Sequence, residues 1–461
     1  MEFVRLSPLG LATLVVGMLL GHVVSLADEL PKDTNKIESL TPEQAQKLAK
    51  EFLGTQAEFK IESGFGFGWG KVPVSNCLPL NGLKSLDVET AKALVSYRKG
   101  PLLLNGLITL DVPTAKALAG FTGQRLFLAG LTTLDADIAK ALAEFEGKAL
   151  YLNGLTTLNA DTARLLAQFK AQWLYLDGLT TLDTNTAKAI AGFKGCKGVS
   201  GLSLDGLTTL DTETARALAG LKGREMSFNG LTMLDTATAK AIAGFKGAGL
   251  DLNGLTTLDA KTAEALSDFK GGGLRLDGLT TLNADTAKAL AGFWRTLYLN
   301  GLTTLDTDTA KALAQFKGNC LYLNGLTTLD TETAKALAEL KGGLRLPIAV
   351  RESFFMANLT PEAALRLAAL FHGDLSFVTA LDSPDSVAIA KVLATLEGPL
   401  KLPNLKKISP KTLTALIKKE GEDVEIPLIE TLELIPEPDG SVTEDFMIPE
   451  GFEMRQRVKE Q

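Results

Sequence analysis

Paired carboxylates recur along the chain, and their residue types could bind calcium or act as a general acid and base. In each pair the second acid is followed three residues later by lysine or arginine, as in Asp135/Asp137, Asp211/Glu213, Asp306/Asp308 and Asp330/Glu332. On a helix this spacing places opposite charges side by side, and acids in a first turn suit the helix dipole. The pattern therefore favours helix starts, and we expect no catalytic residue, no metal and no cofactor.

Histidine is almost absent, since His372 is the one histidine beyond residue 27. That excludes histidine-rich metal sites and leaves a Ser-His-Asp triad a single candidate base. There is no C-x-x-C pair, and the glycines of Asn-Gly and Asp-Gly read as turn residues, not as a phosphate-binding loop. We expect His372 to be an inert surface or capping residue and the protein not to be an enzyme; an enzyme would have to use carboxylates alone.

A lysine recurs at one helix position in most repeats, as at Lys140, Lys188, Lys288 and Lys335, which could suggest nucleic acid. However, the lysines are interleaved with acids, and the formal net charge is −7 at pH 7. We therefore expect a solvated outer face and no nucleic-acid partner.

One position of the repeat varies from unit to unit and could serve recognition. It lies between two leucines of a predicted strand, so its side chain points away from the core. We expect its aromatic residues to be exposed in two groups, because tyrosine and tryptophan are favoured at binding surfaces. The competing interpretation is cross-strand stacking that only stabilises the sheet. The candidate ligand-binding residues on this strand face are Phe127, Tyr151, Trp173, Tyr175, Asp251, Arg275, Tyr298 and Tyr322.

A repeat array must position these residues. Its near-identical phrases are spaced 24 residues apart, with one gap of 28 and one of 23, and each contains one glycine of the set Gly82, Gly106, Gly130, Gly154, Gly178, Gly206, Gly230, Gly254, Gly278, Gly301 and Gly325. In a unit such as residues 150–171, Leu150 and Leu152 alternate like one face of a strand. Ala163, Leu166 and Phe169 then follow helical spacing. One strand and one helix per unit are therefore predicted, with the strands stacked in parallel because one unit buries too little to fold alone.

The ends of each helical half carry their own signals. Asp or Asn begins nearly every one, where its side chain can accept backbone N–H groups, as at Asp87, Asn159 and Asp211. Glycine follows most of them, as at Gly147 and Gly247, and predicts the helix C-terminus. Stacking of the units predicts one column of strand leucines and a second column of phenylalanines.

This pattern resembles the leucine-rich-repeat family as seen in secreted bacterial proteins, over most of residues 78–342. The resemblance implies an α/β solenoid with strands on one face and helices on the other. Leucine stands where the family has its asparagine, as at Leu155, and Asn or Asp instead follows the strand directly, as at Asn153 and Asp177. Free exchange of Asn with Asp predicts a turn position in contact with water.

The array and its flanks predict five segments: a signal peptide over 1–27, an N-terminal capping region over 28–76, the regular repeats over 77–342, degenerate repeats and a cap over 343–435, and an acidic, mobile tail over 436–461. The apolar start ends in Ser25-Leu26-Ala27, a small-residue cleavage motif; an uncleaved membrane anchor is the alternative. Cys77, Cys196 and Cys320 stand about five repeats apart, too far for an internal disulfide.

These features together predict an exported, non-enzymatic protein, secreted, periplasmic or at the cell surface, with no membrane insertion after signal cleavage. We expect it to bind a protein or a surface polymer through its strand face. The alternative is a passive component of the cell envelope or matrix whose repeats set shape and spacing.

Overall fold

The structure, a computed structural model, describes residues 30, 31, 33–52, 55–61, 70–195, 200–419, 424–438 and 440. The chain forms two compact units, the first ending at Gly254 and the second beginning at Leu255. The predicted signal peptide, Cys196 and most of the acidic tail lie outside the described residues.

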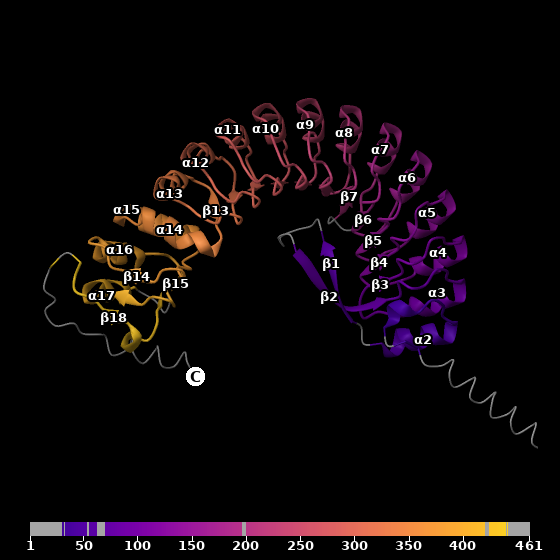
Figure 1. Ribbon diagram of the computed structural model, residues 1–461, viewed down its shortest axis with the longest axis horizontal. Helices are drawn as coiled ribbons and strands as arrows, with labels where there is room; N and C mark the ends of the chain where they lie inside the picture. Colours follow the sequence, from indigo (N-terminus) through magenta and orange to yellow (C-terminus); the bar gives the residue numbers. More distant parts are fainter. Residues whose placement is uncertain are drawn as a thin grey trace, which may run out of the picture. The chain divides into compact units, whose positions relative to one another are not determined.

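In the first unit, strands and helices alternate, and the helices lie on the opposite side of each repeat from the strands (Figure 1). A cap of η1 (Thr34–Lys36) and α2 (Pro42–Glu51) precedes the antiparallel strands β1 (Thr55–Ile61) and β2 (Gly70–Pro79). From β2 on, each strand pairs in parallel with the next, through β3 (Leu102–Leu103), β4 (Arg125–Phe127), β5 (Ala149–Tyr151), β6 (Trp173–Tyr175), β7 (Gly201–Ser203), β8 (Glu225–Ser227) and β9 (Gly249–Asp251). The helices between them are α3 (Val88–Leu94), α4 (Val112–Ala119), α5 (Ala136–Leu142), α6 (Ala160–Leu166), α7 (Thr184–Ile190), α8 (Thr212–Leu218) and α9 (Thr236–Ile242).

The second unit begins with the same alternation. Its parallel strands are β10 (Gly273–Arg275), β11 (Thr296–Tyr298), β12 (Cys320–Tyr322) and β13 (Gly343–Arg345). Its first helices are α10 (Ala260–Ser267), α11 (Ala284–Leu290), α12 (Thr307–Ala314) and α13 (Thr331–Ala338).

The degenerate repeats follow in the same unit. Their helices are α14 (Ile348–Asn358), α15 (Pro361–Leu370), α16 (Ser386–Leu393), α17 (Pro410–Ile417) and the short η2 (Ile429–Thr431). The remaining strands form two small parallel sheets, β14 (Ala380–Leu381) with β16 (Lys407–Ile408) and β18 (Glu433–Leu434), and β15 (Leu400–Lys401) with β17 (Val424–Glu425). Each unit is therefore an α/β solenoid in which a parallel strand and a helix alternate, as the sequence predicts.

The predicted core is confirmed. The strand leucines are fully buried, as at Leu150 and Leu152, and so are nearly all of the phenylalanines. Successive phenylalanine rings stack with centroids 6.4, 6.1 and 6.2 Å apart along Phe121, Phe145, Phe169 and Phe193. Most repeats therefore add one leucine layer and one ring to their neighbour, while Leu221 and Leu340 take the place of the ring in two of them.

The predicted helix starts are also confirmed. Asp or Asn caps the eleven helices α3 to α13, and each cap side chain accepts backbone N–H bonds from the first turn. At Asp211 the second carboxylate oxygen also accepts the Thr214 hydroxyl at 2.6 Å. The first acid of each pair therefore serves as a cap, and in three of the four pairs the second acid contacts the i+3 cation, as in Glu332 with Lys335 at 3.1 Å.

The predicted helix ends are wrong. Helix α6 stops at Leu166, and Phe169 lies beyond it in a turn in which its N–H donates to the Leu166 carbonyl at 2.9 Å. Gly147 and Gly247 are not helix caps. A Cβ on either would lie 2.2 or 2.0 Å from the ring of the preceding phenylalanine, so these glycines make room for that ring.

The repeat glycines lie in turns, as predicted. Positive φ is confined among the described glycines to Gly195, Gly373, Gly398 and Gly440. A Cβ on Gly154, Gly178 or Gly206 would lie 2.0, 2.2 or 1.9 Å from a backbone carbonyl oxygen of the preceding repeat. Glycine is therefore required by the close approach of two backbones and not by a left-handed conformation.

The caps make the fold sensitive to acid. The hydroxyl of the i+3 threonine and its N–H hold the pKa of Asp183, Asp211 and Asp235 below the ordinary value. Because the folded pKa is the lower one, this stabilisation is present above the unfolded pKa of about 3.9 and is lost as pH falls through the folded pKa.

The triple variant Asp183→Asn, Asp211→Asn, Asp235→Asn is expected to lose less stability than the wild type between pH 7 and pH 3. Asparagine already caps α6 and α11, so the fold accepts it. Urea unfolding at the two pH values, followed by circular dichroism, measures the difference. An equal loss in both proteins would contradict the assignment of the acid sensitivity to these caps.

Candidate functional site

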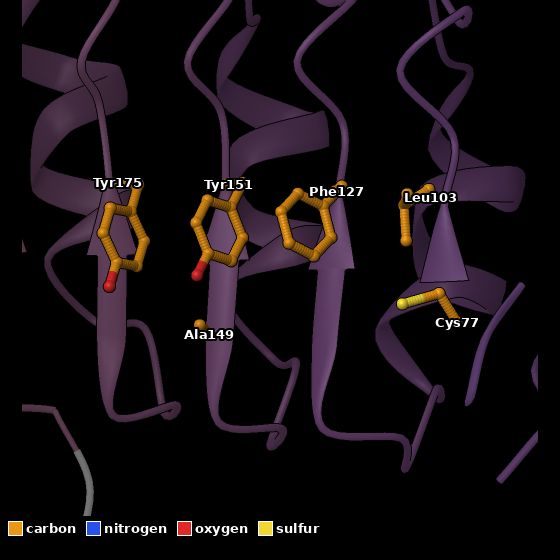
Figure 2. Packing of buried hydrophobic residues seen from close by; sticks show 6 residues of the cluster. All are labelled: Cys77, Leu103, Phe127, Ala149, Tyr151 and Tyr175. Carbon is orange, nitrogen blue, oxygen red and sulfur yellow. The ribbon is translucent and has the colours of Figure 1, made fainter. Parts of the chain in front are cut away.

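The candidate residues in the first unit lie on successive strands, on the side that faces away from the leucines. Figure 2 shows Leu103, Phe127, Tyr151 and Tyr175 side by side, one from each of β3 to β6. The parallel register pairs each of them with the next in chain order. Their direction is therefore as predicted.

Their exposure is not as predicted. Phe127, Tyr151 and Tyr175, called the aromatic stack below, are only 6, 9 and 8% exposed. The reason is face-to-face stacking, with ring centroids 3.9 and 4.2 Å apart and planes within 6° of parallel. Each ring covers its neighbour, and the stack packs with Cys77 and Leu103 into a second small core. The aromatic stack is thus a cross-strand packing device, which was the competing interpretation.

Trp173 extends this cluster and remains half-buried. Its ring stacks on Tyr175 with centroids 5.8 Å apart. A Cβ on Gly201 would lie 2.2 Å from the Trp173 ring. The absence of a side chain at this position of the next strand therefore leaves room for the indole.

Burial also keeps these phenols protonated. It raises the pKa of Tyr151 above its ordinary value and that of Tyr175 further still. Both hydroxyls therefore act as neutral groups over the whole physiological pH range.

The polar residues at the equivalent positions of β7 to β9 are buried as well. Asp251, one of the candidate ligand-binding residues, is only 5% exposed. Ser203 is fully buried and its hydroxyl donates to the Asp177 carboxylate at 2.5 Å, while Ser227 donates to Asp205. On the strand face of the first unit, most outward side chains therefore stack on or hydrogen-bond to one another.

A ladder of Asn and Asp side chains follows the strands. The Asp177 carboxylate accepts the backbone N–H of Asp205 at 3.1 Å, Asp205 accepts that of Asn229 at 2.8 Å, and Asn229 accepts that of Asn253 at 2.9 Å. Only an acceptor oxygen is needed, which explains why Asn and Asp exchange freely. The prediction of a water-exposed turn is wrong for Asp205 and Asn253, which are buried.

In the second unit the equivalent positions remain half-exposed. Arg275, Tyr298, Tyr322 and Arg345 occupy the third position of β10 to β13 and are in register with one another. The Arg275 guanidinium carbon lies 4.0 Å from the centroid of the Tyr298 ring, a cation–π distance, and Tyr298 stacks on Tyr322 at 4.5 Å. These four residues are called the Arg–Tyr row below.

Sequence reasoning missed the last member of the row. Arg345 sits in the phrase Gly343-Leu-Arg, which repeats Gly273-Leu-Arg275, and that identity was the available signal. The Arg345 Nη1 atom lies 3.3 Å from Nδ1 of His372, which is exposed and has φ of 54°. His372 is thus a surface residue, as predicted, but it stands at the end of the row.

The charged and reactive neighbours of the row are few. The first position of each strand holds Gly273, Thr296, Cys320 or Gly343, so no outward residue of β10 to β13 is acidic. Burial raises the pKa of the Cys320 thiol, and Arg345 opposes that shift. The thiol is therefore a neutral group beside the row.

Other kinds of site find little support within the described ranges. No cluster of His, Cys, Asp and Glu there could hold a metal ion. Among the same residues, no helix has the length and apolarity that a membrane span requires. A hollow of about 880 Å³ at the ends of α12 and α13 is lined by Lys311, Lys317, Lys341, Glu339, Gln315 and small or apolar residues, an arrangement without a catalytic pattern.

Comparison with known proteins finds no matching family model and no matching curated protein. Solved structures with a similar fold include the leucine-rich-repeat-containing protein LegL7 from Legionella pneumophila, with 18% identity and a TM-score of 0.38, covering 52% of this chain and 90% of that one. The internalin InlF from Listeria monocytogenes has 16% identity and a TM-score of 0.36, with 69% and 93% covered. TLR13 in its complex with ssRNA13 has 16% identity and a TM-score of 0.38, with 78% and 51% covered. At these values the likeness carries no argument about a ligand or a partner.

Proposed function

We propose that this leucine-rich-repeat-type solenoid is an exported, non-enzymatic protein of the secreted bacterial kind that binds a protein or a surface polymer through its strand face. The observation that carries the proposal is the Arg–Tyr row. Its large side chains are half-exposed, although the equivalent position in the first unit is closed by stacking or by hydrogen bonds. Tyrosine and arginine, with tryptophan, are the residues enriched among those that contribute most to binding.

Variation along the repeats supports the same conclusion. The capping residue, the glycine and the core leucines hardly change from unit to unit, whereas the outward strand position holds Phe, Tyr, Ser, Asp or Arg. On a repetitive scaffold, specificity has to come from the positions that differ.

Affinity capture from the producing cell's envelope and surroundings tests the proposal. The double variant Tyr298→Ser, Tyr322→Ser is expected to lose most of the material that the wild type captures. The variant Lys288→Ser, Lys335→Ser, which alters the exposed helix face, is expected to capture as the wild type does. Circular dichroism establishes that both variants are folded. Equal capture by the wild type and the tyrosine variant would refute binding through these residues.

The passive alternative has one observation in its favour. The aromatic stack is an internal packing device, and near-identical repeats would suit a component that only sets shape and spacing. The variant used for affinity capture therefore leaves Tyr151 and Tyr175 unchanged, since replacing them would disturb the fold.

Export is proposed from the apolar segment and the small-residue motif that ends at Ala27. N-terminal sequencing of the protein recovered outside the cytoplasm tests it, with Asp28 as the expected first residue. The exclusion of nucleic acid likewise remains a prediction, supported by the net charge of −7 and by exposed cation–acid pairs such as Lys335 with Glu332.

A further inference from the structure

We infer that the edge of the second unit where its regular helices lead into strands binds an acidic polysaccharide, independently of the Arg–Tyr row. In each of these repeats a buried phenylalanine or leucine follows the helix, and the next residue begins the loop to the strand. Those next residues are Lys270, Trp294, Lys317 and Lys341, called the loop-edge row below. All four side chains are exposed.

The lysines of the loop-edge row differ from those on the helix face in their acidic partners. A helix-face lysine such as Lys311 lies 3.3 Å from the acid three residues before it. Lys317 and Lys341 have no carboxylate at ion-pair distance within the described part of the chain. Lys270 lies 3.8 Å from Asp268, at the limit of an ion pair. The row therefore presents positive charge that the protein leaves largely unneutralised.

The hollow at the ends of α12 and α13 lies beside two of these lysines. Its volume of about 880 Å³ falls within the range of small-molecule sites, about 300–1,000 Å³. Its lining brings the ammonium groups of Lys311, Lys317 and Lys341 together with one carboxylate, that of Glu339, and the amide of Gln315. This excess of positive charge, with an amide beside it, suits a ligand that carries both acidic groups and hydroxyls.

The backbone beneath the lysines is held by the neighbouring repeat. The Lys317 N–H donates to the Ala291 carbonyl at 3.1 Å. A Cβ on Gly318 would lie 2.2 Å from the Arg295 carbonyl oxygen, and one on Gly342 would lie 2.6 Å from that of Gly318. Successive loops thus approach each other closely. The lysines rise from a backbone that needs no ordering when a ligand binds, which lowers the entropic cost of binding.

The repeat spacing favours a linear ligand. The rings of Phe269 and Phe293, which directly precede Lys270 and Trp294, stack with centroids 6.3 Å apart. The row offers one side chain at each such step along the unit. A polymer with one negative charge per monomer can contact several positions at once, and each further contact strengthens binding by multivalency.

Trp294 favours a sugar polymer over other polyanions. It occupies the position that lysine holds in the other three repeats, and it is 40% exposed. The Arg295 guanidinium carbon lies 4.0 Å from the centroid of its ring, a cation–π contact that holds the indole in place. The flat indole can pack against the apolar face of a sugar ring while the lysines bind acidic groups. Single-stranded nucleic acid fits less well, because its bases stack on successive aromatic side chains and the row has one.

Titration calorimetry of the full chain with polygalacturonate, which carries one carboxylate per sugar, tests the inference. The variant Lys317→Gln, Lys341→Gln is expected to weaken binding by at least about tenfold, as the loss of two charge-assisted hydrogen bonds implies. The variant Lys317→Arg, Lys341→Arg keeps both charges and is expected to retain binding. Fully methyl-esterified polygalacturonate is expected not to bind.

A matched control removes the same two charges elsewhere. Lys222 and Lys246 hold the equivalent loop position in the first unit, are exposed and likewise have no carboxylate at ion-pair distance among the described residues. The variant Lys222→Gln, Lys246→Gln is therefore expected to bind polygalacturonate as the wild type does. An equal loss in both glutamine variants, or no loss in the Lys317 and Lys341 variant, would overturn the inference.

Trp294→Ala separates the sugar from its charge. It is expected to weaken binding of polygalacturonate by about fivefold, as the loss of one aromatic contact implies, and to leave binding of inorganic polyphosphate unchanged. Circular dichroism establishes that the variant is folded. Equal weakening of both polymers, or tighter binding of oligothymidylate than of polygalacturonate by the wild type, would contradict a polysaccharide ligand.

The Arg–Tyr row provides the last comparison. The variant Tyr298→Ser, Tyr322→Ser is expected to bind polygalacturonate as the wild type does. If it loses that binding, the polymer lies on the strand face, so the inference falls and the proposed function stands. If polygalacturonate binding depends on Lys317 and Lys341 while capture is indifferent to the two tyrosines, the proposed function falls and the inference stands.

Discussion

Replacing Tyr151 with alanine is expected to lower the free energy of unfolding of the first unit by about 3 kcal/mol, the range of large-to-small core substitutions. The ring lies between Phe127 and Tyr175, at 3.9 and 4.2 Å, and is 9% exposed. Its removal would leave a ring-sized gap in the aromatic stack, because the two neighbours are fixed to their own strands. Urea unfolding monitored by circular dichroism measures the change.

Two controls separate packing from other effects. Tyr151→Phe keeps the ring and is expected to cost less than about 1 kcal/mol. Tyr322→Ala removes a half-exposed ring that stacks on one tyrosine, and is expected to cost about 1 kcal/mol. If Tyr151→Ala lowered the free energy of unfolding by no more than Tyr322→Ala does, the aromatic stack would not be structural. Ligand binding by these residues of the first unit would then again be the better interpretation.

Gly206→Ala is the second substitution with a large expected effect, again about 3 kcal/mol, at the upper end of what overpacking costs. The new Cβ would lie 1.9 Å from the Asp177 carbonyl oxygen and 2.8 Å from that of Leu179. Both atoms belong to the backbone of the preceding repeat, so no side-chain rotation can relieve the overlap. The neighbouring strands must separate instead.

Gly192→Ala is the matched control for this prediction. Its Cβ would lie 3.3 Å from the Ala189 carbonyl oxygen and 3.5 Å from the Ala167 Cβ, close to ordinary contact. We expect a change within about 1 kcal/mol, in either direction, because alanine also restricts the unfolded chain. Equal midpoints for the two alanine variants in urea would show that backbone approach does not explain the repeat glycines.

Much of the scaffold could be predicted because each signal is local. Asn159 and Asp211 mark the N-termini of the helices that they cap, and the alternation of Leu150 with Leu152 indicates which strand face is buried. The antiparallel pair β1 and β2 was not predicted, since the region before Cys77 lacks the repeat signature that identifies the other strands.

The candidate site was harder because exposure depends on neighbours that a single repeat does not contain. Tyr151 and Tyr322 occupy equivalent positions, yet only Tyr151 has an aromatic ring on both sides. The pairing of Arg345 with His372 joins the last strand of the regular sheet to a degenerate repeat, 27 residues along the chain. Neither relation can be read from one unit.

The Asn/Asp ladder also tolerates uneven repeat lengths. Its side-chain-to-backbone bonds span 24 residues from Asp205 to Asn229, 28 from Asp177 to Asp205 and 23 from Asp277 to Asn300, with distances of 2.8–3.1 Å throughout. The length differences fall between the phenylalanine and the next strand, as after Phe193 and Phe293. A reporter tag or a foreign epitope grafted into that connection should therefore be carried without loss of strand register, which makes the protein a practical display platform.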